Sequence, residues 1–112
     1  MYISTNSFLS NLIGGVRVSS EETAFPPQMV SQIFNMVAKN QWIILGGDVV
    51  TCDLKHTYDN WYYEPIRDLP LFENTKQSIA KSDQYISEYR EKNGDKYLYI
   101  FTISSSYVDG KI

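Results

Sequence analysis

Residues 97–103 read Tyr-Leu-Tyr-Ile-Phe-Thr-Ile and give the strongest strand signal in the chain. Aromatic and β-branched residues favour strands, and successive side chains of a strand point to opposite faces. The residues at odd positions therefore point one way and those at even positions point the other. Because both sets are largely apolar, we expect a central strand, or one whose second face is covered by a partner.

A long helix is predicted directly before this strand, from about residue 71 to residue 92. Phe72, Ile79 and Ile86 recur every seven positions in it. With the residues three places after each of them, Thr75, Ser82 and Tyr89, they form a narrow stripe. Ser82, near the middle of the stripe, is small enough for another element to approach the helix closely. Asn93 and Gly94 are typical of a helix end.

Two more strands are predicted in the middle of the chain. Residues 41–52 form a β-rich run that is interrupted by Gly46 and Gly47. Paired glycines inside a strand indicate a bulge, a bend or the close approach of another backbone. Residues 57–64 are rich in Thr, Tyr and Trp, and Pro65 ends the run. One face of this second strand packs on the core, and the residues leave open which face it is.

Two helices and a brief extended piece are predicted in the first forty residues. Residues 5–13 have a capping side chain at their start and two glycines after their end. Residues 16–18 form the extended piece. Pro26 and Pro27 open the second helix, where a missing N–H costs nothing. Its core-facing stripe consists of Val30, Ile33, Phe34 and Val37.

The order helix, helix, strand, strand, helix, strand predicts an α+β fold with helices on one face of a small, mainly antiparallel sheet. The length fits one domain over residues 1–112. One cysteine and one histidine exclude a disulfide framework and a His-rich or multi-cysteine metal centre, and we expect no cofactor. No apolar run could span a bilayer and no signal peptide is evident, so we expect a cytoplasmic location.

The net charge of −3 originates in the middle of the chain. Residues 48–73 hold six acidic and two basic residues, whereas the segments before and after carry net charges of 0 and +1. The same middle segment is rich in Tyr and Trp. This composition suits an interface with a basic protein partner, and it suits equally an acidic loop flanked by core aromatics. A pI near 5.0 does not favour nucleic-acid binding.

Several residues could carry chemistry, and each has a simpler structural explanation. Gly46 and Gly47 could cradle a phosphate, but a strand follows instead of a helix, so a bulge that points Asp48 outward is favoured. Cys52 and His56 could form a nucleophile and its base, yet proximity in sequence does not establish such a pair. We expect Cys52 to be buried at a strand end and His56 to lie in a solvated turn. The acidic residues fit no calcium-loop spacing, so a solvated acidic face is favoured over a metal site.

Residues 42–49, Trp-Ile-Ile-Leu-Gly-Gly-Asp-Val, and residues 58–64, Tyr-Asp-Asn-Trp-Tyr-Tyr-Glu, resemble the two motif cores of the bacterial immunity protein 40 family. With the later helix and the closing aromatic strand, the resemblance covers roughly residues 16–103. It implies a small α+β protein that is encoded beside a polymorphic or contact-dependent toxin and neutralises it in the cytoplasm. The positions that match the motifs either hold the fold or touch the toxin: Gly46, Gly47, Asp48, Asp59, Asn60 and Trp61.

We therefore expect a non-catalytic inhibitor whose partner is the C-terminal domain of a toxin, with a nuclease as one candidate. Acidic residues steer this partner and aromatic residues anchor it, which gives the predicted contact set Asp48, Asp53, Asp59, Trp61, Tyr62, Tyr63, Glu64 and Asp68. We expect no nucleic-acid or membrane partner. Two alternatives stay open: a homodimeric module that pairs through a sheet edge or an open face, and a small hydrolase that uses Cys52 and His56.

Overall fold

The computed structural model describes residues 2–3, 16–17 and 22–104. Their elements, in chain order, are β1 (Tyr2–Ile3), β2 (Val16–Arg17), β3 (Thr23–Phe25), the 3-10 turn η2 (Pro27–Met29), α1 (Val30–Asn40), β4 (Ile43–Val50), β5 (His56–Tyr62), α2 (Leu71–Asn93) and β6 (Leu98–Ser104). β2 falls within the extended piece predicted at residues 16–18. The helix predicted over residues 5–13 lies outside the described residues.

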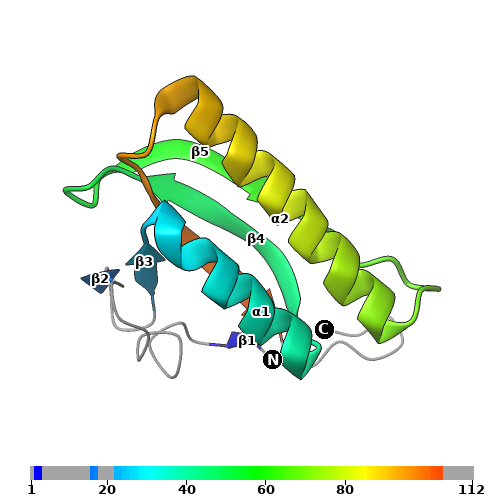
Figure 1. The fold of residues 1–112 in the computed structure, drawn as a ribbon. Coiled ribbons are helices and arrows are strands. Elements are labelled where there is room, and N and C mark those ends of the chain that lie inside the picture. The colour runs from blue at the N-terminus through cyan, green and yellow to red at the C-terminus, as the bar shows by residue number, and fades with distance from the viewer. Residues whose placement is uncertain (1, 4–15, 18–21, 105–112) are drawn as a thin grey trace.

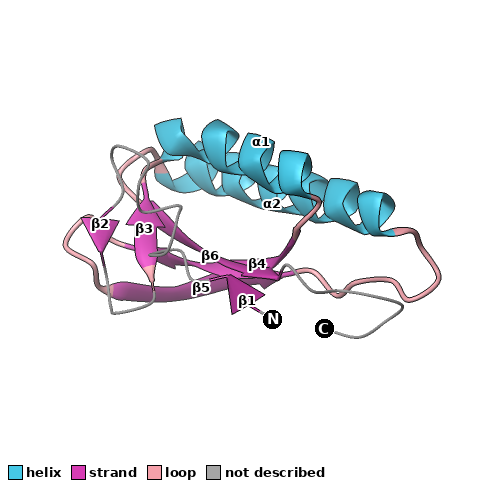
Figure 2. Ribbon diagram, turned by 90° about the horizontal axis from the view of Figure 1, so that it is seen from below, coloured by secondary structure: helices cyan, strands magenta, loops and turns pink. Residues whose placement is uncertain are grey.

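The strands form an antiparallel sheet with the order β2-β3-β6-β4-β5, and β1 pairs with β6. β6 lies between β3 and β4, so the prediction of a central strand over residues 97–103 is confirmed. α1 and α2 run antiparallel to each other (Figure 1) and both lie on the same face of the sheet (Figure 2). The predicted α+β architecture is therefore confirmed.

The main core lies between the two helices and the sheet. β6 contributes Tyr99, Phe101 and Ile103 to this core, and each is at most 3% exposed. These residues belong to the odd-numbered set of the predicted strand. Ile100, from the even-numbered set, is also fully buried and belongs to a second, smaller cluster with Ala24 and Val50. Both faces of β6 thus carry buried apolar residues, as the sequence predicts.

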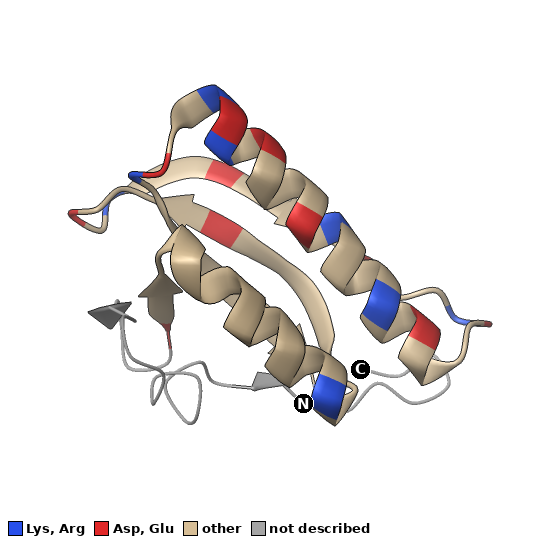
Figure 3. Cartoon of the chain, in the orientation of Figure 1, with Lys and Arg blue, Asp and Glu red and all other residues tan. Residues whose placement is uncertain are grey.

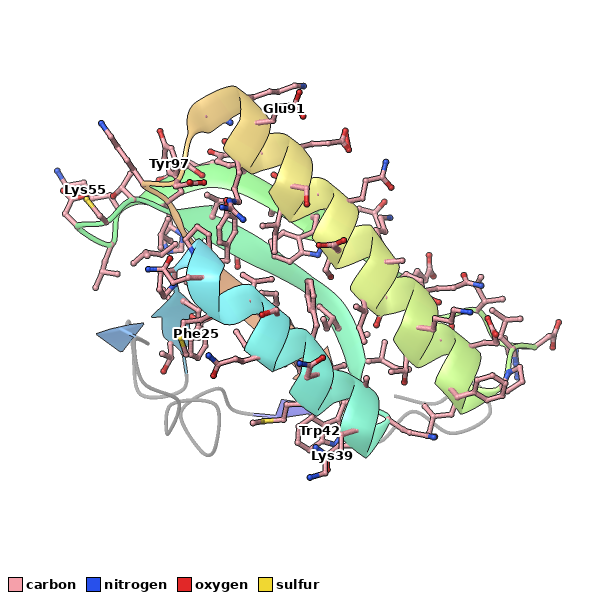
Figure 4. All side chains as sticks on the ribbon, in the orientation of Figure 1. Phe25, Lys39, Trp42, Lys55, Glu91 and Tyr97 are labelled. Carbon is pink, nitrogen blue, oxygen red and sulfur yellow. The ribbon has the colours of Figure 1, made fainter. Side chains whose placement is uncertain are left out.

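The prolines open this helical segment as predicted, but its first turn is the 3-10 turn η2, which begins at Pro27, and α1 follows from Val30. Its buried face consists of Val30, Ile33 and Val37. Phe34 is half-buried and packs edge-on against Phe101, with ring centroids 6.3 Å apart. Phe25 and Trp42 lie at opposite ends of this helix (Figure 4). α1 therefore rests on the sheet through an apolar stripe.

The paired glycines of β4 produce a bulge and also make room for two neighbouring strands. The register between β4 and β6 shifts between Ile44 and Gly46, which leaves one extra residue in β4. Gly46 has a φ of +153°, and a Cβ atom there would lie 2.3 Å from the backbone oxygen of Trp61. A Cβ atom on Gly47 would lie 2.3 Å from the backbone oxygen of Ile100. The predicted bulge and the predicted close approach are both confirmed.

The bounds of α2 agree with the prediction, and its buried face agrees with the prediction in part. Of the apolar residues in the predicted stripe, Phe72 is 56% exposed, Ile79 is half-buried and only Ile86 is buried, at 3% exposure. Thr75 and Ser82 of the same stripe are buried. An α-helix drifts away from a seven-residue repeat, so one face cannot bury all three apolar residues against a sheet. The buried line includes small polar residues spaced by four, which we call the polar seam: Asn74, Ser78 and Ser82.

The polar seam bonds α2 to β4 and β5. Ser78 Oγ accepts a hydrogen bond from the backbone N–H of Ile44, at 3.1 Å, directly before the bulge. Ser82 Oγ accepts one from the indole Nε1 of Trp61, at 2.9 Å. The close approach predicted at Ser82 is confirmed. α2 is thus held to the sheet to a large extent by hydrogen bonds, whereas α1 is held by apolar contacts.

Candidate functional site

The acidic and aromatic segment of residues 48–73 forms the end of β4, the hairpin loop, β5, the connection to α2 and the first three residues of α2. β5 is the edge strand of the sheet beyond β4. Its neighbours on the helix side belong to the C-terminal half of α2 (Figure 1). The predicted contact residues therefore lie on and around one edge of the molecule.

Trp61 and Tyr63 face inward from this edge. Trp61 is 5% exposed and Tyr63 is 8% exposed. The Tyr63 hydroxyl donates a hydrogen bond to Asn74 Oδ1 at 2.5 Å, and the Asn74 side chain also bonds both backbone groups of Ile66. Two of the three predicted aromatic anchors are thus core residues in this structure. The alternating side chains of residues 57–64 define two faces of the strand but do not show which face is buried. Only the small residues of α2 indicate which face the helix covers.

Tyr58 and Tyr62 are the most exposed large apolar side chains among the described residues, at 88% and 69%. Lys81 Nζ lies 5.1 Å from the centroid of the Tyr62 ring, an arrangement typical of a cation–π contact. Tyr58 has a φ of +68° at a register shift between β4 and β5. A non-glycine residue in this conformation is uncommon, and such residues cluster at functional sites.

The predicted acidic contact residues are exposed or half-buried, but they do not gather in one patch (Figure 3). Asp48 pairs with Asn60 across β4 and β5, so these two side chains share the face opposite to Asp59. Asp53 lies in the hairpin loop, and Glu64 and Asp68 lie in the connection to α2. A hydrogen bond from the Thr51 hydroxyl and, to a smaller extent, the charge of Lys55 lower the pKa of Asp53.

Asp59 borders a surface hollow between β5 and the C-terminal half of α2. The hollow has a volume of about 340 Å³ and is lined by Asp59, Tyr85, Glu88, Tyr89, Lys92 and Asn93. The Tyr89 hydroxyl donates a hydrogen bond to Asp59 Oδ2 at 2.8 Å. Burial, and then this hydrogen bond, raise the pKa of Tyr89 to about 12. Burial also raises the pKa of Tyr85, with a smaller contribution from the charge of Asp59. The sequence does not reveal this hollow, because its residues are close only in the folded chain.

Cys52 and His56, the residues considered for catalysis, both lie on the surface. Cys52 is exposed in the hairpin loop, so the expectation of a buried cysteine is wrong, because β4 ends two residues earlier. His56 is exposed as expected, but it is the first residue of β5 and does not lie in the turn before it. Among residues 2–3, 16–17 and 22–104, no cluster of three His, Cys, Asp or Glu side chains could hold a metal ion. None of the helices in the described part of the chain is long and apolar enough to cross a membrane.

A family model described as immunity protein 40 matches residues 11–103, which is most of the chain. The chain belongs to the immunity protein 40 family. Neither the curated proteins nor the solved structures gave a match. As a member of an immunity-protein family, it has a toxin as its general class of protein partner.

Within this immunity protein, the motif residues divide into two groups. Gly46 and Gly47 allow close packing between strands, and Trp61 is buried beneath α2. These three residues hold the fold. Asp59 and Asn60 are exposed and Asp48 is half-buried, so these three residues are at least partly available for contact. The immunity protein 40 match also includes the whole of α2 and thus the hollow beside Asp59.

Proposed function

We propose that this chain is a non-catalytic immunity protein that binds a cognate bacterial toxin and blocks its activity in the cytoplasm. Membership of the immunity protein 40 family supports a toxin as the partner. The observation that carries the proposal is the exposure of Tyr58 and Tyr62, at 88% and 69%, on the edge strand β5. Exposed aromatic residues of this kind commonly anchor protein interfaces.

The acidic residues of the segment supply the second element of the proposal. Asp48, Asp53, Asp59, Glu64 and Asp68 produce a negative field that steers a cationic partner to the β5 edge. A toxin with a basic cleft, such as a nuclease, fits this field. Trp61 and Tyr63 support β5 from beneath and are not direct contacts in this proposal.

Co-purification tests the proposal directly. The chain is produced together with the toxin domain that is encoded beside it, and we expect a complex that protects cells from the toxin. Charge reversal at Asp53 and Asp68 should slow association and flatten its dependence on salt concentration. The control reverses Asp83, an exposed residue of α2 outside the acidic segment. A toxin that neither co-purifies nor loses activity would show that the proposal is wrong.

Light scattering on the isolated protein separates the proposal from the homodimeric alternative. A monomer that forms a complex with the toxin agrees with the proposal. A stable dimer without affinity for the toxin would support a structural module instead.

A further inference from the structure

The hollow between β5 and α2 combines aromatic faces with carboxylates. Its floor includes a stack that begins in the core, since the rings of Trp61 and Tyr85 have centroids 5.0 Å apart and an interplanar angle of 24°. Tyr85 and Tyr89 continue the stack with centroids 6.0 Å apart and an angle of 21°. Tyr97, labelled in Figure 4, meets Tyr89 edge-on at 5.4 Å. The half-buried tyrosines of this stack therefore pack, through Tyr85, on the buried ring of Trp61.

Two carboxylates border these rings from different elements. Asp59 is exposed on β5, and its Oδ2 accepts the hydrogen bond from Tyr89. Its Oδ1 accepts none from the residues that the structure describes. Glu88 is exposed on α2. Among the described residues, the ion pairs within 4 Å are Lys55–Asp53 and Arg90–Asp95, so Glu88 and its neighbour Lys92 do not neutralise each other at contact distance.

We propose that this hollow binds an arginine side chain of the toxin. The proposal rests on the proposed function and names one part of its interface. A guanidinium group is planar, so it can lie against a tyrosine ring while its N–H groups donate to Asp59 and Glu88. Asp59 and Glu88 outweigh the charge of Lys92 and make the hollow complementary to a cation. Preorganisation favours binding, because the Tyr89 hydrogen bond already orients Asp59.

The free protein allows a test that needs no toxin. Nα-acetyl-L-arginine amide is titrated into the full chain, and the ring resonances of Tyr85 and Tyr89 are followed by NMR. We expect saturable shifts at these rings, and much smaller shifts with the uncharged analogue Nα-acetyl-L-citrulline amide. The double variant Asp59→Asn/Glu88→Gln should lose the saturable response. The matched double variant Asp83→Asn/Glu91→Gln removes the same charge from exposed sites that do not line the hollow, and should titrate like the wild type.

A second arm measures the affinity for the toxin domain by calorimetry. Asp59→Asn/Glu88→Gln should weaken binding by about tenfold or more, because it removes charge-assisted hydrogen bonds. Lys92→Gln should strengthen binding, since it removes a competing cation from the hollow. Asp83→Asn/Glu91→Gln serves again as the control.

The two arms distinguish the failure of this proposal from the failure of the proposed function. If the wild type binds the toxin and Asp59→Asn/Glu88→Gln binds equally well, the arginine site is overturned and the proposed function stands. If the wild type binds no toxin, the proposed function fails. Equal titration of the arginine and citrulline amides, or of the wild type and Asp59→Asn/Glu88→Gln, overturns the arginine site without reference to any toxin.

Discussion

The two faces of the edge strand β5 carry similar residues with opposite roles. Trp61 is 5% exposed and bonds to α2, whereas Tyr62, the next residue, is 69% exposed. The inner face determines whether the strand folds against α2, and the outer face is available to a partner. Aromatic residues in one short segment therefore do not form one functional set. The difference can be tested, because substitution of Trp61 should reduce stability and substitution of Tyr62 should reduce binding.

The largest effect is expected for Trp61→Ala. This substitution removes a buried indole, its hydrogen bond to Ser82 and its ring stack with Tyr85. We expect the free energy of unfolding to fall by about 3–5 kcal/mol, as measured by urea denaturation. A loss below about 1 kcal/mol would contradict the inner role of Trp61.

Asn74→Ala tests the polar seam on the helix side. Asn74 is fully buried, and its side chain bonds the Tyr63 hydroxyl and both backbone groups of Ile66. We expect a loss of about 2–4 kcal/mol in urea denaturation, because buried polar groups lose their partners. The exposed residue Gln77 on the same helix provides the control, and Gln77→Ala should stay within about 0.5 kcal/mol of the wild type.

Tyr62→Ala tests the outer face and should separate binding from stability. We expect the affinity for the toxin to fall by about 2 kcal/mol, the size of an interface hot spot. The stability should change by less than about 0.5 kcal/mol, because the side chain is mostly exposed. Calorimetry and urea denaturation measure the two effects. An unchanged affinity would exclude Tyr62 as an anchor.

The smallest effect concerns the hydroxyl of Tyr99, which lies in the inner layer. It is buried and has no hydrogen-bond partner among the residues that the structure describes. Tyr99→Phe should therefore be neutral or stabilise the protein by up to about 1 kcal/mol. A clear destabilisation would show that the hydroxyl has a partner.

Tyr99 also makes the free energy of unfolding depend on pH in the alkaline range. Burial raises the pKa of Tyr99 from 10.0 to about 12. As the pH rises, the unfolded chain thus loses the phenolic proton before the folded chain does. The contribution of this pKa difference to the free energy of unfolding is complete below pH 10 and is lost as the pH rises toward 12. Tyr99→Phe should flatten this loss in urea denaturation between pH 9 and pH 12. Tyr89 has a similarly raised pKa and should account for part of the remaining slope.

The sequence predicts those parts of the fold in which neighbouring residues show a clear pattern. Residues 97–103 alternate clearly, and Gly46 and Gly47 mark the bulge. β3 was not predicted, because three residues are too few to show alternation. The sequence predicts the buried face of α2 only in part, because its seam is polar and hydrogen-bond partners from other elements cannot be read from one helix. The hollow beside Asp59 cannot be read from the sequence for the same reason, since β5 and α2 supply its residues.

The polar seam also restricts how α2 can move along the sheet. Its three residues bond to different partners, in β4, in β5 and in the segment that follows β5. A slide of one helical turn, about 5.4 Å, would break all three sets of bonds at once. The hydrogen bonds on the buried side of α2 therefore determine its axial position, independently of its solvent-exposed residues. Such a helix can accept many substitutions on its outer side without shifting, which leaves this surface free to diversify while the architecture is preserved.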